Sequence, residues 1–143
     1  MFRAALLAIM SLLLAWPIWA SAEEEAVDEE SAAEASAQAR YIHLEPAFVL
    51  NYGSEGRMKY LRTEVALRVT GSDAASRVSH HKPYIRNNLV MLLSAQEGDV
   101  MNTAQGRESL RQVALDEVRA VMVELEGSPY IDDLYFSNFV VQN

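Results

Sequence analysis

Residues 58–69 read MKYLRTEVALRV and alternate between two sets of side chains at a period of two. The first set is mostly apolar and comprises Leu61, Thr63, Val65, Leu67 and Val69. The second set is mostly polar and comprises Tyr60, Arg62, Glu64, Ala66 and Arg68. Because successive side chains of a strand point to opposite faces of its sheet, this stretch predicts a β-strand with one buried and one wet face.

The preceding segment, residues 41–51, reads YIHLEPAFVLN and predicts a partner strand, since its apolar residues also recur at a period of two. Pro46 has no backbone N–H to donate, so the segment should lie at an edge of the sheet or break at this residue. Residues 52–56, YGSEG, are rich in turn formers. The two segments therefore predict an antiparallel hairpin.

Three stretches after the hairpin predict helices. A short one follows Gly71 and ends near Ser79. Pro83 suits the first position of the second, where a missing N–H costs nothing, and Thr103 is a good N-cap for the third, which ends at Gly127. The apolar stripe of the second helix comprises Ile85, Leu89, Leu92 and Leu93. That of the third comprises Leu110, Ala114, Val118, Val121 and Leu125.

The last predicted element is a strand over residues 134–141, LYFSNFVV, which are apolar on both faces. This pattern predicts a central strand that is covered on both sides. We expect it beside residues 58–69, with the helix of residues 103–125 across one face. The predicted fold class is α+β: an antiparallel hairpin and a C-terminal strand form one small sheet, with two or three helices packed on it.

The chain has 143 residues and a net charge of −8, and its acidity is concentrated near the N-terminus. Residues 23–39 hold seven acidic residues, no basic one and almost no large apolar side chain. They cannot bury enough surface to offset their ordering entropy, so we expect a disordered linker. The folded domain, residues 40–143, is nearly neutral and has no basic stripe to bind nucleic-acid phosphates. The absence of cysteine excludes disulfide bonds and a thiol nucleophile.

Residues 1–22 predict a leader or a membrane anchor. Arg3 precedes a thirteen-residue apolar run, and Ala20 and Ala22 form a small-residue cleavage signal before Glu23, which is the order of a secretory signal peptide. Up to Ala22 the apolar stretch is nineteen residues long, a marginal membrane span. Cleavage before Glu23 and an uncleaved anchor are the two alternatives, and both place the folded domain beyond the inner membrane.

No grouping of residues predicts catalysis, a cofactor or a metal. His80 and His81 are adjacent, so their side chains project in different directions and are poorly placed to share a metal ion. Asp132 and Asp133 would point to opposite faces of a strand, which is wrong for an acid and base pair. The sequence therefore predicts a protein that is not an enzyme. A small hydrolase with a metal at His80 and His81 is the alternative that metal analysis would test.

Four phrases in order carry a family resemblance: YIHLEPAFVLN, HKPYIRNNLVMLLS, NTAQGRESLR and DLYFSNFVVQ, over roughly residues 41–142. Together they resemble the FliL family of flagellar basal-body accessory proteins. The positions that match the family pattern are Asn51, Pro83, Ile85, Arg86, Thr103, Gly106, Phe136, Phe139 and Gln142.

The resemblance implies a function and a fold. It implies a non-catalytic accessory of the flagellar motor that associates with the basal body and the stator units and supports swimming and swarming. It further implies rings of copies, a place on the periplasmic side of the bacterial inner membrane, and a fold like that of stomatin (SPFH). The family usually keeps an uncleaved anchor with a longer basic start, from which this leader departs. The alternative is therefore a soluble, secreted FliL-like periplasmic domain with no motor role.

Arg86, Arg107 and Arg111 are candidates for partner contact. Arg107 and Arg111 lie four residues apart on the third predicted helix, offset from its apolar stripe, so we expect both to be exposed. Arginine is enriched at interfaces between proteins. Two roles stay open for these residues: a solvated helix face, or polar contact with a partner or a neighbouring copy.

Overall fold

The computed structural model of the protein describes residues 30–34, 36–53, 56 and 58–142. The predicted leader or anchor, with Ala20, Ala22 and Glu23, lies outside these residues. Within them, no helix combines the length and the apolar character that crossing a bilayer requires.

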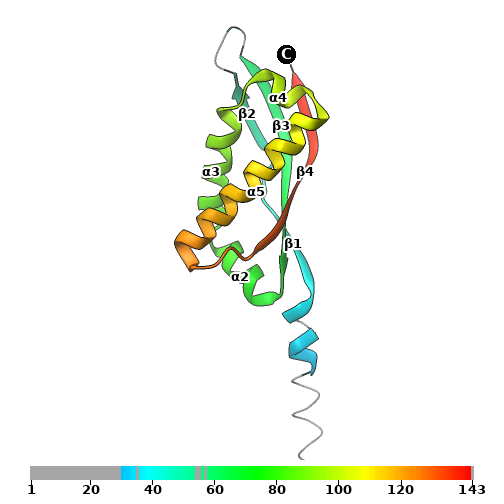
Figure 1. The fold of residues 1–143 in the computed structure, drawn as a ribbon, viewed down its shortest axis with the longest axis vertical. Helices are drawn as coiled ribbons and strands as arrows, with labels where there is room; N and C mark the ends of the chain where they lie inside the picture. Colours follow the sequence, from blue (N-terminus) through cyan, green and yellow to red (C-terminus); the bar gives the residue numbers. More distant parts are fainter. Residues whose placement is uncertain (1–29, 35, 54–55, 57, 143) are drawn as a thin grey trace, which may run out of the picture.

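An antiparallel sheet of four strands forms one layer of the molecule (Figure 1). Its central strand, β3 (Lys59–Thr70), is the strand that alternation predicts. On one side of β3 lie β1 (Ala39–His43) and β2 (Phe48–Tyr52), which pair with successive stretches of it. On the other side lies β4 (Ile131–Gln142). The predicted hairpin and the predicted neighbour of β3 are both confirmed.

The outer strand of the hairpin is interrupted at the predicted proline. The Glu45–Pro46 peptide bond, which is cis, lies between β1 and β2. Just before it, the N–H of Leu44 donates to the carbonyl oxygen of Val65 at 2.9 Å. Proline cannot donate to a ladder, so the edge resumes only at β2.

The two faces of β3 differ as alternation predicts. The side chains of the first set are at most 2% exposed: Leu61, Thr63, Val65, Leu67 and Val69. Those of the second set are half-buried or exposed. Helices α3 and α5 cover one face of the sheet (Figure 1). Their buried side chains belong to the same core cluster as the first set, so the core lies between these helices and the sheet.

The chain between β3 and β4 is helical. Its helices are α2 (Ser72–His80), α3 (Lys82–Ser94), α4 (Gly98–Asn102) and α5 (Ala104–Glu126). Pro83 lies in the first turn of α3, Thr103 is the N-cap of α5, and left-handed Gly127 (φ 80°) ends α5. These predictions are confirmed. Sequence reasoning missed α4, because five residues are too few for a period to appear.

The helices bury most of their predicted stripes. Ile85, Leu89 and Leu93 of α3 are fully buried. Four stripe positions of α5 are at most 5% exposed: Leu110, Ala114, Val118 and Val121. Leu125 is 38% exposed, because it lies in the last turn of α5, where the helix leaves the sheet (Figure 1).

β4 lies at an edge of the sheet, which corrects the prediction of a central, doubly covered strand. β3 is its only partner among the described strands. Tyr135 and Val140 are 37% and 45% exposed, whereas Leu134 on the opposite face is fully buried. Apolar side chains on both faces of β4 predict that both faces are covered, but the helices pack on only one face of the sheet.

Residues 30–34 and 36–37 are helical and exposed, whereas their composition predicts disorder. Alanine and glutamate have high helix propensities, which favours a helical backbone in this segment. The segment also reaches the folded body: the N–H of Gly71 donates to the carbonyl oxygen of Gln38 at 2.9 Å.

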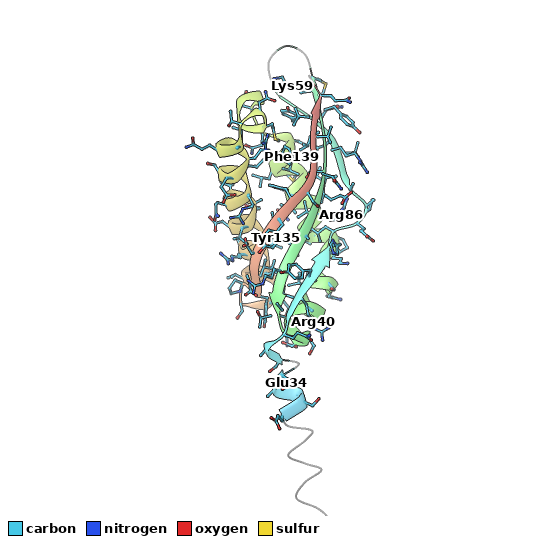
Figure 2. All side chains as sticks on the ribbon, turned by 90° about the vertical axis from the view of Figure 1, so that its right-hand side faces the viewer. Glu34, Arg40, Lys59, Arg86, Tyr135 and Phe139 are labelled. Atoms are coloured by element: carbon cyan, nitrogen blue, oxygen red, sulfur yellow. The ribbon has the colours of Figure 1, made fainter. Side chains whose placement is uncertain are left out.

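The predicted α+β class is confirmed, while the likeness to stomatin stays a prediction. The first described residues and the C-terminal end of β4 lie at opposite ends of the long axis (Figure 1). Figure 2 shows the same separation between Glu34 and Lys59. We call the end that holds α4, the start of α5 and the last residues of β4 the distal end.

Candidate functional site

Arg86, the first arginine of the predicted contact set, is used inside the fold. Its guanidinium donates to the carbonyl oxygens of Leu44 and Pro46 at 2.6 and 2.7 Å and lies 4.2 Å from the centre of the Phe48 ring. These carbonyls belong to the interruption between β1 and β2. Because carbonyls at a break have no ladder partner, Arg86 fixes the shape of this edge.

Arg111 has a similar role at the opposite edge. Its Nη1 donates to the carboxylate of Asp133 and, at 3.1 Å, to the carbonyl oxygen of Leu134. Its Nε and Nη2 donate to Glu108 at 2.8 and 2.7 Å. The side chain is only 20% exposed, so the prediction of an exposed Arg111 is wrong. Its donors join α5 to β4.

Arg119 adds a second link of this kind, which sequence reasoning missed. Its Nε donates to the carbonyl oxygen of Ile131 at 2.8 Å, and its Nη2 to that of Asp132 at 2.7 Å. Its spacing from Arg111, about two helical turns, was the available signal that both face the same neighbour. The two arginines thus occupy backbone carbonyls in the first half of β4.

The carboxylates around Arg111 stay ionised at neutral pH. Hydrogen bonds from Arg111 lower the pKa of Glu108 to about 2. Partial burial alone would raise the pKa of Asp133, but hydrogen bonds from the Leu134 N–H and from Arg111 outweigh burial and lower it. The link between α5 and β4 is therefore charged over the physiological range.

His81 contacts Glu126, which places the histidine pair in the fold. Nε2 of His81 lies 2.7 Å from Oε1 of Glu126, and Nη1 of Arg77 donates to Oε2 at 2.8 Å. These hydrogen bonds lower the pKa of Glu126. The cluster joins the start of α3 to the end of α5, and His80 packs edge-on against His81, with ring centres 4.9 Å apart.

The other acidic pair is divided between two partners. Asp132 accepts a hydrogen bond from the Thr70 hydroxyl at 2.6 Å, whereas Asp133 faces Arg111. Nowhere in the described ranges do three histidine, aspartate or glutamate side chains come together as a metal site would require. Asp132 and Asp133 therefore do not form an acid and base pair.

Several family-pattern positions serve the packing of helices. Ile85 is fully buried in the core. Pro83 starts α3, and the Thr103 hydroxyl accepts from the N–H of Gly106 at 3.0 Å. A Cβ at Gly106 would overlap the carbonyl oxygen of Val100. Only glycine therefore lets α4 approach α5 this closely.

Phe136 and Phe139 line a groove between β4 and the start of α5. Their ring centres are 5.6 Å apart in an edge-to-face arrangement, and Figure 2 shows Tyr135 and Phe139 along β4. The guanidinium of Arg107 lies 5.8 Å from the centre of the Phe139 ring. The groove has a volume of about 250 Å³ and is lined by Ala104, Arg107, Glu108, Arg111, Tyr135, Phe136 and Phe139. We call it the α5–β4 groove.

The first and last family-pattern positions meet at the distal end. Strand register places Asn51 of β2 opposite Tyr60 on one side and Gln142 of β4 opposite Tyr60 on the other. Asn51 and Gln142 are exposed, and Tyr60 is half-buried. Sequence alone could not bring them together, because their proximity depends on β3 lying between β2 and β4.

The uncovered sheet face also carries exposed aromatic and apolar side chains. The rings of Tyr41 and Tyr135 have centres 6.3 Å apart, and Tyr41 is 57% exposed. Val49 and Val140 lie on either side of Arg62 in the register. Tyrosine and arginine are typical of protein interfaces.

The geometry defines a small α+β domain that offers surfaces for contact and, in the part of the chain that the structure describes, no catalytic grouping. The family model for the flagellar basal body-associated protein FliL matches residues 41–142. The chain therefore belongs to the FliL family, and the resemblance is confirmed. FliL is a family of flagellar accessory proteins, not of enzymes.

Two relatives give the scale of the similarity. The flagellar protein FliL of Aquifex aeolicus is 26% identical over 99 residues, which cover 69% of this chain and 59% of that protein. The flagellar protein FliL of Escherichia coli K12 is 24% identical over 95 residues, which cover 66% and 60%. The matched part thus spans about six-tenths of the length of these relatives.

Proposed function

We propose that this protein is a non-catalytic accessory of the flagellar motor that holds stator units at the basal body and supports torque under load. It works from the periplasmic side of the bacterial inner membrane. Copies pack side by side into rings or partial rings around the stator and favour its engaged state. Membership of a basal body-associated family supports the proposed association with the flagellar basal body.

The observation that carries the proposal is the meeting of exposed family-pattern residues at the distal end. Ile85, Thr103 and Gly106 match the pattern and have packing or capping roles. Asn51 and Gln142 match it too, but they are exposed on either side of Tyr60. Packing does not dictate the identity of these two exposed side chains, so we infer that they serve contact with a partner.

The N-terminal segments provide the attachment. Residues 1–22 act as anchor or cleaved leader, and residues 23–39 as tether or tail, with residues 40–143 as the working domain. Since the described chain begins opposite the distal end (Figure 1), an anchored domain would present its distal end away from the membrane.

A deletion strain tests the proposal. We expect slower swimming in media of rising viscosity, restored by the wild-type gene but not by Asn51→Ala with Gln142→Ala. A matched control, Ser76→Ala on exposed α2, should restore motility fully. Copurification of stator subunits with the tagged wild-type chain tests the partner. Unchanged motility of the deletion strain at every load would refute the motor role.

The second candidate function is a secreted FliL-like domain with no motor role. The short apolar run and the small-residue signal at Ala20 and Ala22 favour it. N-terminal sequencing of the protein from cells separates the two functions. A start at Glu23 supports the secreted domain, and a retained Met1 or Phe2 supports an anchored motor component.

A further inference from the structure

The two halves of β4 have different surroundings along its outer edge. In the first half, Arg119 and Arg111 donate to the carbonyl oxygens of Ile131, Asp132 and Leu134. Beyond Asn138, no side chain of the described residues donates to a backbone carbonyl of the strand, and β3 is its only described strand partner. An edge with free N–H and C=O groups is a template for another strand.

A bulge separates the two halves. The pairing with β3 shifts by one residue between Ser137 and Val140, and Asn138 has a positive φ of 49°. The Thr63 hydroxyl donates to the carbonyl oxygen of Ser137 at 3.1 Å, which fixes the bulge from the core side. Bulges turn the following residues to a new direction. Residues 139–142 therefore form a separate, short edge that leads to the distal end.

The α5–β4 groove lies beside this edge. Phe136 and Phe139 give it an aromatic wall, and its volume of about 250 Å³ has room for one large side chain. Aromatic rings favour edge-to-face contact with a further ring. A strand added to β4 would direct alternate side chains to the two faces of the sheet, so one of them would enter this groove.

The α5–β4 groove contains one cation, Arg107, that keeps donors available. Arg107 donates one hydrogen bond within the described chain, to the carbonyl oxygen of Met101 at 3.3 Å, and a guanidinium has five N–H donors. Glu108, the carboxylate of the groove, is already held by Arg111. Arg62 is exposed on the other face, opposite Val140. An acidic partner segment complements these charges.

We propose that residues 139–142 bind an extended, acidic segment of a partner protein by strand addition. The segment would place an aromatic side chain in the α5–β4 groove and a carboxylate against Arg107. Backbone hydrogen bonds would supply affinity, and the groove would supply specificity. The partner's identity as a basal-body protein rests on the proposed function; the binding chemistry does not.

A second copy is a poorer occupant of this edge. The opposite edge of the sheet is interrupted at Pro46 and fixed by Arg86, so it offers no long strand for head-to-tail pairing. Pairing of β4 with its own copy would bring together two sets of the same cations, which is unfavourable.

Fluorescence anisotropy of a labelled peptide with the full chain tests the proposal. The probe is a strand-forming peptide of sequence TTFTETE, whose phenylalanine and glutamates share one face of the strand, and its counterpart TTFTKTK carries lysines. We expect the acidic peptide to bind the wild type and to lose about tenfold in affinity, or 1.4 kcal/mol, with Arg107→Glu. The lysine peptide should prefer Arg107→Glu. Gln105→Glu, exposed in the same helical turn and outside the groove, is the matched control and should change nothing.

Hydrogen exchange establishes the mode of binding. The peptide should protect the amides of residues 139–142 and leave those of residues 131–134 unchanged, and an N-methylated peptide should not bind. Equal affinity of the acidic peptide for Arg107→Glu, or binding of the N-methylated peptide, would overturn the proposal. So would self-association that protects residues 139–142 before any peptide is added. These readouts are independent of motility, so the proposed function can fail separately.

Discussion

The two halves of β4 belong to one strand, yet they differ in the hydrogen bonds that they receive from arginines of α5. Along the first half, Arg111 and Arg119 use their donors on backbone carbonyls and on Asp133. Beside the second half, Arg107 keeps most of its donors available over Phe139. The first half is thus bonded to side chains of the domain, whereas among the described residues no side chain donates to a backbone carbonyl of the second half.

This difference assigns different roles to the three candidate arginines, which the sequence could not tell apart. Arg86, Arg107 and Arg111 formed one set of candidate contacts, but Arg86 and Arg111 hold the two edges of the sheet. Whether any of the three contacts a partner stays a prediction. An arginine that is bonded to backbone carbonyls contributes to stability, so only Arg107 retains the donors that a partner needs.

Arg111→Ala should have the largest effect on stability, because Arg111 links α5 to the first half of β4. It removes the charged hydrogen bond to half-buried Asp133 and the bond to the carbonyl oxygen of Leu134, so we expect a loss of about 3 kcal/mol of unfolding free energy. Urea unfolding measures it. The control is Arg107→Ala, four residues away on the same helix, which should cost less than about 1 kcal/mol. Equal losses in the two variants would remove the distinction between the halves.

Gly106→Ala should disturb the distal end with a smaller loss. The new Cβ would overlap the carbonyl oxygen of Val100, and relief of the overlap must displace α4 from α5, at about 2 kcal/mol. Thermal unfolding measures the change. Gln105→Ala, one residue away and exposed, should be close to neutral. A stable Gly106→Ala variant would mean that α4 is not held against α5.

Much of the fold follows from residue patterns. Alternation in residues 58–69 predicts both faces of β3, and Pro83 and Thr103 predict the starts of α3 and α5. The place of β4 does not follow, because Tyr135 and Val140 are apolar yet lie on the uncovered face. The sequence pattern of a strand indicates which side chains are apolar, but it does not indicate which face of the strand another element covers.

Less of the candidate site is predictable. The hydrogen bonds of Arg86 and Arg119 end on backbone carbonyls, which every residue has, so no sequence motif marks the acceptor. The meeting of Asn51 and Gln142 depends on the order of strands in the sheet. Such contacts are properties of the tertiary fold.

Acid should reduce the difference between wild type and Arg111→Ala. The folded pKa of Glu108 is about 2 against an ordinary 4.5, and that of Asp133 is lowered as well. A carboxyl group with a lowered folded pKa stabilises the fold above its ordinary pKa and loses this effect as pH falls through the folded value. The urea midpoints should therefore converge between about pH 5 and pH 2. A gap that stays constant or widens would show that these carboxylates do not depend on Arg111.

Asn51→Ala with Gln142→Ala should have the smallest effect on stability. Both side chains are exposed, so the unfolding free energy should change by less than about 0.5 kcal/mol. Circular dichroism during urea unfolding provides this check. A large loss would assign the two residues to the fold and remove them from the contact surface.

A photo-crosslinking amino acid at Gln142, compared with one at Ser76 of α2, shows whether the distal end contacts the motor. In swimming cells, we expect a crosslinked product at position 142 that mass spectrometry identifies as a basal-body or stator protein, and none at position 76. Equal yields of the same product at both positions, or no product at position 142 in fully motile cells, would contradict this expectation.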